Sequence, residues 1–438
     1  MRIHTALVVA AVAAPVATPV LAQSYARVEL LTPGGPLPFV VESDRFNPTG
    51  RPGGAFNLDL TIINGEERLG GGNISAVPDR YDGLFLWPLE SYGSRIQGQL
   101  ISSTLTAESI RDLVAEGEWV TNRRSGPVRV PLVIGRARGP SDRFDPIIPR
   151  APLTPADVEP APFGGRWSVD FEDDEDLAVG EFEVDRATGR ATGTFLTVTG
   201  DYRFLEGRVD GELMRLSAFD GAHAFLFHAR MQEDGSIEGD FWSGTWHHET
   251  WKAVQDGDAS LPDAFGLTEV TVERFDRETL GRFEFTSLEG EPTTLAQVAP
   301  PGEPRVLMVF GSWCPNCHDA TVFMKELHES YSDEGLKIVG LAFEHSTDPR
   351  VSIPNVERYI EAKGVPYEIL IAGYSQKDDA TESLGFLDRV RSYPTTVFID
   401  RAGFVRAVHQ GFTGPATGVR YEQLRERFTE IIESMLED

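Results

Sequence analysis

The sequence predicts two kinds of structure in one chain: an all-β N-terminal region, closed as an antiparallel barrel or sandwich, and an α/β C-terminal domain. Asp-Gly pairs separate alternating apolar stretches between residues 164 and 255, as in consecutive hairpins. After residue 262 the pattern changes to strand-like and helix-like segments in alternation, beginning with an unbroken apolar run at residues 306–310. A length of 438 residues also favours two or three domains over a single core.

The composition indicates a globular protein and excludes some classes of partner. Hydrophobic residues make up 41% of the chain and charged residues 25%, as in soluble domains. The formal net charge is −28. Because so acidic a chain repels nucleic-acid phosphates and anionic lipid head groups, we expect no nucleic-acid partner.

Residues 1–22 have the pattern of a cleavable signal peptide. Arg2 supplies a positive start, residues 6–14 are apolar, and Ala22 is a small residue suited to the cleavage point. Two prolines interrupt the apolar run, which argues against the alternative of an uncleaved membrane anchor. We therefore expect a soluble protein that is periplasmic or otherwise exported, in an oxidising compartment.

The β-rich N-terminal region is expected to cover residues 24–138. The stretches "AFNLDLTI" and "GLFLWPL" have the alternation of strands. The stretch "TAESIRDLVAEGEW" at residues 106–119 predicts one short helix, with Thr106 as a possible cap. Residues 139–163 contain seven prolines and therefore predict an extended connection.

Residues 164–255 predict an antiparallel meander. Its turns fall at "RATGR" and at three Asp-Gly pairs, which suit the positive φ of type I′ turns. Residues 24–138 could add strands to the same sheet, so the two segments could form one domain. A second connection, "QDGDASLPDAFG", leads to the α/β domain at residues 262–438.

The α/β domain is expected to contain alternating strands and helices with a mixed sheet. Its apolar runs predict buried strands, and its 3.6-residue periodicity predicts amphipathic helices. The predicted strands are 306–310, 337–343 and 367–372, with a hairpin over 395–412, and the predicted helices are 319–331, 354–363, 376–390 and 421–436.

The chain has two cysteines, Cys314 and Cys317, and three kinds of site compete for them. A zinc site needs four ligands, and no second cysteine pair or histidine clamp is present, so we expect no metal. The sequence Cys314-x-x-Cys317-His318 matches the attachment motif of a c-type haem. A redox dithiol fits the surroundings better, because the pair lies between a buried strand and an amphipathic helix.

The dithiol interpretation assigns the two sulfurs different roles. Cys314 falls at the helix start, where unsatisfied N–H groups and the helix dipole favour a thiolate. Cys317 falls one turn inside the helix and is expected to be shielded. Such a pair attacks a disulfide with the first sulfur and resolves the mixed disulfide with the second.

The stretches "FGSWCPNC" and "SYPTTVFIDRAGFV" resemble the TlpA/ResA-like disulfide reductases of the thioredoxin superfamily, over roughly residues 262–438. The resemblance implies a thioredoxin-like fold, no organic cofactor and a cis proline at Pro394 that faces the dithiol. It also implies that Trp313 is an apolar platform, and that Pro394 with Tyr393 and Thr395 shapes substrate docking. The backbone beside the cis proline would offer a short edge on which an extended substrate can pair.

The resemblance extends to a glutamate. In the family, a glutamate at the end of the strand after the CxxC helix lies near the dithiol, and "GLAFEHS" places Glu344 there. Its expected role is to accept or relay the proton of Cys317. The loop "GFTGPATG" near the end of the chain is not a general motif of the family.

These expectations combine into an exported thiol–disulfide oxidoreductase. The resemblance favours reduction of a disulfide-bearing envelope protein, with a membrane thiol carrier as the electron donor. An oxidase or isomerase is an alternative. Another is a binding protein whose β region captures a ligand or partner.

Weaker features lie in the β region. The acidic run at residues 171–177 favours a solvated hairpin loop over a calcium site. Five aromatic residues could line a pocket, although packing in and around the barrel is favoured for them: Trp242, Trp246, Trp251, His247 and His248. His223 and His228 are five residues apart, so on one strand they face opposite sides.

Overall fold

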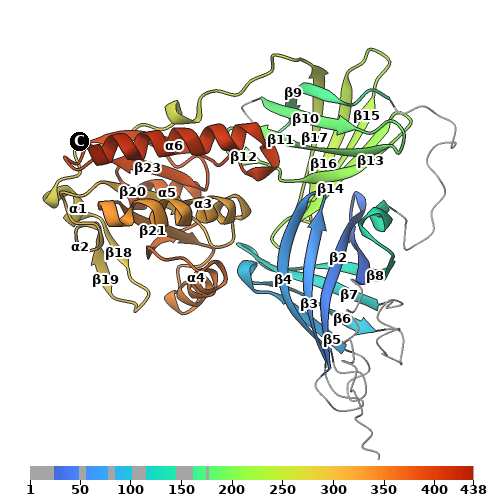
Figure 1. Cartoon of the computed structure of the whole chain (residues 1–438), viewed down its shortest axis with the longest axis horizontal. Helices are drawn as coiled ribbons and strands as arrows, with labels where there is room; N and C mark the ends of the chain where they lie inside the picture. Colours follow the sequence, from blue (N-terminus) through green and yellow to red (C-terminus); the bar gives the residue numbers. More distant parts are fainter. Residues whose placement is uncertain are drawn as a thin grey trace, which may run out of the picture.

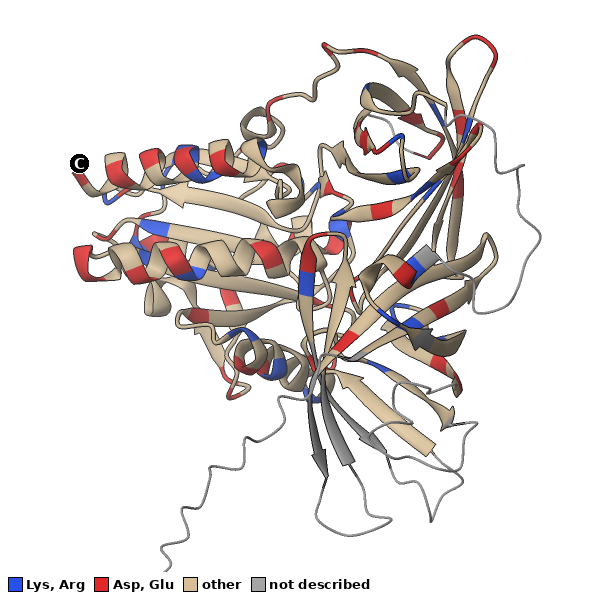
Figure 2. Cartoon of the chain, turned by 45° about the vertical axis from the view of Figure 1, so that its right-hand side comes forward, with Lys and Arg blue, Asp and Glu red and all other residues tan. Residues whose placement is uncertain are grey.

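The structure is a computed structural model that describes residues 24–48, 56–76, 84–100, 115–144, 161–173 and 177–437. Two β-barrels and one α/β domain follow each other along the chain and lie against one another (Figure 1). The predicted signal peptide and most of the proline-rich connection fall outside the described residues. Acidic residues are found in all three domains rather than in one segment (Figure 2).

Barrel 1 is a closed ring of antiparallel strands in sequence order, completed by the pairing of the first strand with the last. Its interior is filled by large apolar side chains such as Phe39, Trp87 and Trp119, which are buried. The strands are β1 (Ser24–Thr32), β2 (Gly35–Pro48), β3 (Phe56–Asn64), β4 (Glu67–Ala76), β5 (Leu84–Leu89), β6 (Ser94–Leu100), β7 (Ala115–Arg123) and β8 (Gly126–Ala137).

The short helix predicted at residues 106–119 is wrong in its described part. Residues 106–114, including Thr106, lie outside the described residues, and residues 115–119 belong to β7. This segment pairs with both β6 and β8, and it buries Ala115 and Trp119 in the barrel. Ladder pairing and core burial therefore override the helical pattern of the sequence.

Barrel 2 is a second closed sheet. Because β10 pairs with both β9 and β11, the strand pairing returns to its start, and the short β12 extends one side. Gly211 and Gly235 adopt φ of 60° and 83° in the predicted Asp-Gly turns. The strands are β9 (Gly165–Phe171), β10 (Ala178–Val184), β11 (Arg190–Thr197), β12 (Gly200–Asp201), β13 (Leu205–Asp210), β14 (Leu213–Phe219), β15 (Ala224–Met231), β16 (Ile237–Ser243) and β17 (His247–Gln255).

The possibility that residues 24–138 extend the sheet of residues 164–255 is wrong, since each segment closes its own sheet. The barrels nevertheless share apolar packing. Phe219 of β14 stacks on Phe39 of β2 with ring centroids 4.4 Å apart. The Asn64 side chain donates a hydrogen bond of 2.7 Å to the Phe219 carbonyl. Barrel 1 therefore supports barrel 2 from one side.

The C-terminal domain has a mixed sheet in the order β19-β18-β22-β21-β20-β23-β24. Its central strands β20, β21 and β22 are parallel, and β23 and β24 return antiparallel. The strands are β18 (Glu284–Thr286), β19 (Pro292–Thr294), β20 (Arg305–Phe310), β21 (Lys337–Glu344), β22 (Glu368–Tyr374), β23 (Thr395–Ile399) and β24 (Val405–Gln410).

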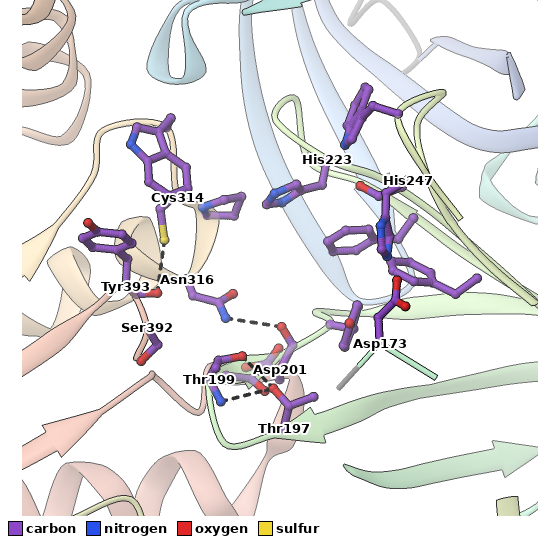
Figure 3. Close-up of a pocket in the computed structure, with 18 of the residues that line it drawn as sticks. Asp173, Thr197, Thr199, Asp201, His223, His247, Cys314, Asn316, Ser392 and Tyr393 are labelled. Atoms are coloured by element: carbon purple, nitrogen blue, oxygen red, sulfur yellow. Dashed lines mark hydrogen bonds between the residues drawn. The ribbon is translucent and has the colours of Figure 1, made fainter. Parts of the chain in front are cut away.

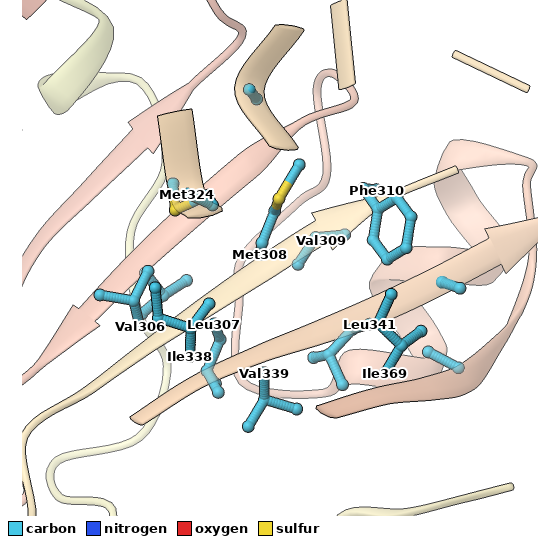
Figure 4. Packing of buried hydrophobic residues seen from close by; sticks show 14 of the residues in the cluster. Val306, Leu307, Met308, Val309, Phe310, Met324, Ile338, Val339, Leu341 and Ile369 are labelled. Carbon is cyan, nitrogen blue, oxygen red and sulfur yellow. The ribbon is translucent and has the colours of Figure 1, made fainter. Parts of the chain in front are cut away.

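Helices cover this sheet, and the core between the layers is apolar. Met308 and Val309 of β20, Leu341 of β21 and Met324 of α3 are all buried in this core (Figure 4). None of the helices in the described residues is long and apolar enough to cross a membrane. The α-helices are α1 (Arg277–Arg282), α2 (Leu295–Val298), α3 (Pro315–Tyr331), α4 (Pro349–Lys363), α5 (Lys377–Leu384) and α6 (Val419–Glu437).

Two predicted helix boundaries differ from the structure. The helix expected from residue 354 begins earlier, at Pro349, because the Asp348 side chain accepts the Arg350 N–H at 3.0 Å and caps it. The helix expected over 376–390 ends at Leu384, where Gly385 takes a left-handed C-cap with φ 60°.

One buried arginine joins all three domains. Arg203, next to β12 in barrel 2, forms an ion pair of 2.8 Å with Asp319 of α3. The same guanidinium pairs with Glu67 of barrel 1 and lies 3.7 Å from the buried Asp220. Charges buried to this extent need partners, so this cluster holds the domains in one arrangement.

Candidate functional site

The two cysteines lie where the central strand β20 passes into helix α3. Cys314 is the N-cap residue of α3, and Pro315 takes the first helical position, where its missing N–H leaves no bond unmade. Both thiols are free. Cys314 is 6% exposed, whereas Cys317 has no exposed surface. The structure therefore gives only Cys314 access to a reaction partner.

The Cys314 sulfur is held by backbone groups on two sides. It accepts the Cys317 N–H at 3.3 Å, and its S–H donates to the Tyr393 carbonyl at 3.4 Å. An N–H aimed at the sulfur is an interaction that stabilises a thiolate. The residues thus place a nucleophilic sulfur at the helix start, next to the chain turn before β23.

The second thiol has the opposite environment. Burial raises the pKa of Cys317 well above its usual value, and the adjacent Cys314 sulfur and the Glu344 charge raise it further. Cys317 therefore stays protonated until a base removes its proton. This difference matches the predicted roles of an attacking and a resolving thiol.

Glu344 ends β21 and is 1% exposed. Its carboxylate accepts two hydrogen bonds from Ser312, one from the N–H at 2.9 Å and one from the hydroxyl at 2.8 Å. Burial raises the pKa of Glu344 to about 7, although the bonds from Ser312 act in the opposite direction. Since Ser312 belongs to the turn before Cys314, this carboxyl group is positioned at the dithiol and can exchange a proton near neutral pH.

Trp313 and Tyr393 form the apolar rim of the dithiol. The Trp313 indole donates to the Phe343 carbonyl at 2.8 Å, stacks on His345 and meets the Tyr393 ring edge to face. The Tyr393–Pro394 peptide bond is cis, as the resemblance implied. The structure thus brings together Cys314, Cys317, Trp313 and Tyr393.

The Thr395 side chain is buried, so its part in substrate docking stays a prediction for the backbone of this turn. Thr395 is fully buried, its hydroxyl donates to the Ser392 carbonyl at 2.9 Å, and its backbone pairs with β20 and β24. A side chain committed to this turn cannot reach a substrate directly. Thr395 instead stabilises the loop that carries Tyr393.

His318, the residue that completes the haem motif, is buried between domains. Its Nε2 donates to the Ser312 carbonyl at 2.7 Å, and its ring stacks on Tyr92 of barrel 1 with centroids 4.3 Å apart. Burial lowers the pKa of His318 well below its usual value. This imidazole is neutral and serves the contact between α3 and barrel 1.

A cavity of about 450 Å³ opens in front of Cys314, and barrel 2 forms its opposite wall (Figure 3). The dithiol side contributes Trp313, Cys314, Pro315, Asn316, Lys377, Ser392 and Tyr393. Barrel 1 contributes Arg123. The lining side chains of barrel 2 are Asp173, Thr197, Thr199, Asp201, Tyr202, His223, Phe225, Phe241, Ser243, Trp246, His247 and Glu249.

The pocket considered for the tryptophans and histidines of barrel 2 is present in part. Trp246 and His247 line the cavity. Trp251 is buried in the barrel core, and Trp242 and His248 stack on each other away from the cavity lining. His223 lines the cavity whereas His228 does not. His223 precedes β15 and only His228 lies on it, so the two histidines do not share a strand as predicted.

One group of cavity residues has the donor types of a metal site. Asp173, His247 and Glu249 place ligand-type atoms within 4.8 Å of one another. Hydrogen bonds explain this spacing, since His247 Nε2 contacts Glu249 at 3.0 Å and the Asp173 N–H donates to Glu249 at 3.3 Å. Asp173 is the described member of the predicted acidic loop that reaches the cavity.

The loop "GFTGPATG" fixes barrel 2 onto the dithiol domain. The Gly414 N–H donates to the buried Asp201 carboxylate at 2.6 Å, and Asn316 donates to the Asp201 carbonyl at 3.4 Å. A Cβ added at Gly411 would lie 2.7 Å from the Thr199 carbonyl carbon. Burial raises the pKa of Asp201 to about 6, while the Gly414 bond lowers it. No sequence pattern indicated this contact.

Comparisons with known proteins agree with the geometry of this domain. The sequence profile of the AhpC/TSA family matches residues 277–408. Thiol-disulfide oxidoreductase ResA of Geobacillus thermodenitrificans is 28% identical over 129 residues, which are 30% of this chain and 66% of ResA. Thiol:disulfide interchange protein DsbE of Vibrio cholerae is 30% identical over 110 residues, which are 25% of this chain and 51% of DsbE.

A solved thioredoxin-family thiol:disulfide interchange protein from Chlorobium tepidum is 22% identical, with a TM-score of 0.27, and covers 35% of this chain and 92% of that chain. The chain spans about half to two thirds of the length of the curated relatives it matches. The C-terminal domain is a TlpA/ResA-like domain of the thioredoxin superfamily.

Proposed function

We propose that this protein is an exported thiol–disulfide oxidoreductase that reduces disulfides with the Cys314/Cys317 dithiol. The observation that carries the proposal is the pair of free thiols at the start of α3, of which only Cys314 lines the cavity. The resemblance favours a disulfide-bearing envelope protein as the substrate and a membrane thiol carrier as the donor.

The reaction uses each group of the site once. The Cys314 thiolate attacks one sulfur of the substrate disulfide, and the first substrate thiolate leaves. Glu344 accepts the Cys317 proton, and the Cys317 thiolate then attacks the Cys314 sulfur. The second substrate thiolate leaves, so the substrate gains two electrons and the protein dithiol loses them. A donor dithiol restores the reduced pair.

The reductase direction rests on the resemblance to the disulfide reductases, and an oxidase or isomerase remains the alternative. A couple is a strong oxidant when its reduced form is stabilised by a low-pKa attacking thiolate, so the reduction potential of the Cys314–Cys317 couple decides between them.

The binding-protein alternative becomes part of the same proposal. Barrel 2 contributes one wall of the cavity that Cys314 lines, so binding by the β region and chemistry by the dithiol share one site. A scaffold domain without redox function would not need a positioned carboxyl group beside two free thiols.

Alkylation of the reduced full-length protein tests the assignment. Near neutral pH, a small alkylating reagent should modify Cys314 much faster than Cys317, since Cys317 is buried and protonated. Equal rates, or a faster Cys317, would reject the roles. The same preparation should be colourless, and a Soret band would overturn the dithiol mechanism.

A further inference from the structure

The dithiol is covered in the assembled protein. Cys314 is 6% exposed, and the wall opposite it is fixed by Asp201, which binds Gly414 and Asn316, and by the Arg203–Asp319 ion pair. Barrel 2 stands opposite the sulfur, so a reaction partner has to enter the cavity to reach Cys314. A cavity of about 450 Å³ is of the size that binds small ligands.

Two cationic residues line the cavity, Arg123 of β7 and Lys377 of α5. The Arg123 guanidinium lies over the Trp246 ring, 4.0 Å from the ring centroid. Burial lowers the pKa of Arg123 to about 10, so the group remains charged at neutral pH. A half-buried arginine of this kind suits a carboxylate ligand.

Acidic groups lie on the wall that faces the dithiol. Asp173 and Glu249 both line the cavity, next to His247 (Figure 3). Glu249 is buried, whereas Asp173 is exposed. Aromatic side chains complete the barrel 2 lining, among them Phe225 and Phe241. Together the cavity offers positive groups, negative groups and an apolar surface, which matches a molecule with both charges and an apolar middle.

We propose that this cavity selects a low-molecular-weight disulfide that carries both carboxylate and ammonium groups, such as a disulfide of a small amino-acid thiol. The inference rests on the proposed dithiol function and replaces its folded protein substrate with a small one. One such disulfide and the reduced dithiol give two small thiols and the Cys314–Cys317 disulfide. An external dithiol reductant then returns the two electrons.

Single-turnover reduction of four small disulfides by the pre-reduced full chain tests this selectivity. Cystine carries both charges, cystamine only ammonium groups, dithiodiglycolate only carboxylates, and 2-hydroxyethyl disulfide no charge. Each rate is divided by the rate at which dithiothreitol reduces the same disulfide. This ratio corrects for the different intrinsic reactivities of the four disulfides. Cystine should exceed 2-hydroxyethyl disulfide by about tenfold, as complementary charge in a partly buried site allows.

Two variants probe the charged walls. Arg123→Gln should lower the cystine-to-hydroxyethyl ratio by about tenfold, since a half-buried charge contact is lost. Asp173→Asn should lower it by about twofold to threefold, because Asp173 is exposed and screened. The control His248→Gln changes a histidine on the same barrel but outside the cavity lining and should leave the ratio unchanged.

The outcomes separate the two proposals. No reduction of any disulfide, including the uncharged one, would refute the dithiol function itself. Reduction with no preference for cystine, or with an unchanged ratio in Arg123→Gln, would refute only the selectivity. Insulin or an extended peptide disulfide reduced faster than cystine would also overturn the inference, because the cavity would then not choose the substrate.

Discussion

The two walls of the cavity are built in different ways. The dithiol wall takes Trp313 and the Cys314 sulfur from the continuous turn between β20 and α3. The barrel 2 wall collects residues from several separate strands and loops, such as Asp173, Thr199, His223 and His247. The comparison teaches that the reactive groups depend on local sequence, whereas the surface that a substrate meets depends on strand closure. Each prediction below separates the contributions of these two walls.

Loss of either sulfur should have the largest effect. Cys314→Ser should reduce exchange to background, because a serine hydroxyl is a far weaker nucleophile than a thiolate at neutral pH. Cys317→Ser should instead accumulate mixed disulfides on Cys314, since the resolving step is absent. Mass spectrometry of the non-reduced protein should detect mixed disulfides in Cys317→Ser and none on residue 314 in Cys314→Ser. Turnover by Cys314→Ser at the wild-type rate would show that barrel 2, not the dithiol, carries the activity.

Arg203→Ala should produce the next largest effect, because this residue links barrel 2 to the other two domains. Removing one partner from a buried ion-pair cluster costs about 3–5 kcal/mol of unfolding free energy. Urea unfolding followed by fluorescence measures the loss. Arg190→Ala is the matched control, since the Arg190 side chain is 48% exposed in its pair with Glu206, and about 0–1 kcal/mol is expected. Equal losses of unfolding free energy in Arg203→Ala and Arg190→Ala would contradict the role of the Arg203 cluster in holding the domains together.

Glu344→Gln tests the proton path on the dithiol wall. We expect exchange to slow by about tenfold, near the lower end of acid–base assistance, because thiolate attack also limits the rate. The pH–rate profile should lose its inflection near pH 7, since burial raises the pKa of Glu344 to about 7. Glu368→Gln, an exposed strand glutamate, is the control. An unchanged rate from pH 5 to 9 would leave Glu344 without a role.

The same carboxyl group makes stability depend on pH. The folded protein binds the Glu344 proton more tightly than the unfolded chain does, so this contribution is present below about pH 4.5 and is lost as pH rises through about 7. At about 1.4 kcal/mol per pKa unit, the loss is on the order of 3 kcal/mol. Urea unfolding at pH 4.5 and pH 8 should show a smaller decline in Glu344→Gln. If the unfolding free energy declined equally in the wild type and in Glu344→Gln, a group other than Glu344 would be responsible for the pH dependence.

Asn316→Ala should have the smallest effect, although Asn316 lies between the two cysteines. Its bond to the Asp201 carbonyl is long at 3.4 Å, so we expect a stability loss below about 1 kcal/mol. Exchange should remain close to the wild-type rate. A loss as large as that of Arg203→Ala would mean that this contact, rather than the ion-pair cluster, holds barrel 2 in place.

Much of the dithiol wall could be predicted from the sequence. The order of apolar strand, CxxC and amphipathic helix is local, and the resemblance added Glu344 and the cis Tyr393–Pro394 bond. The motif gives the position of Thr395 in the chain but not the burial of its side chain. The hairpin turns of barrel 2 were also predictable, since Gly211 and Gly235 supply the positive φ those turns require.

The barrel wall could not be predicted in the same way. Closure into two separate barrels depends on long-range strand pairing, and alternation alone gives neither partner nor register. The segment at residues 115–119 shows this limit, because its amphipathic pattern fits a helix until β6 and β8 pair with it. The Asp201–Gly414 contact joins positions far apart in sequence and leaves no local signal.

The reduction potential of the Cys314–Cys317 couple tests the central claim most directly. Equilibration of the full-length protein with redox buffers, followed by alkylation and mass analysis, gives this value, with Cys317→Ser as the control that should show no intramolecular couple. We predict a reversible two-electron couple at or below about −200 mV, toward the value of about −270 mV of thioredoxin. A potential near about −120 mV, or no reversible couple at all, would contradict a reductase.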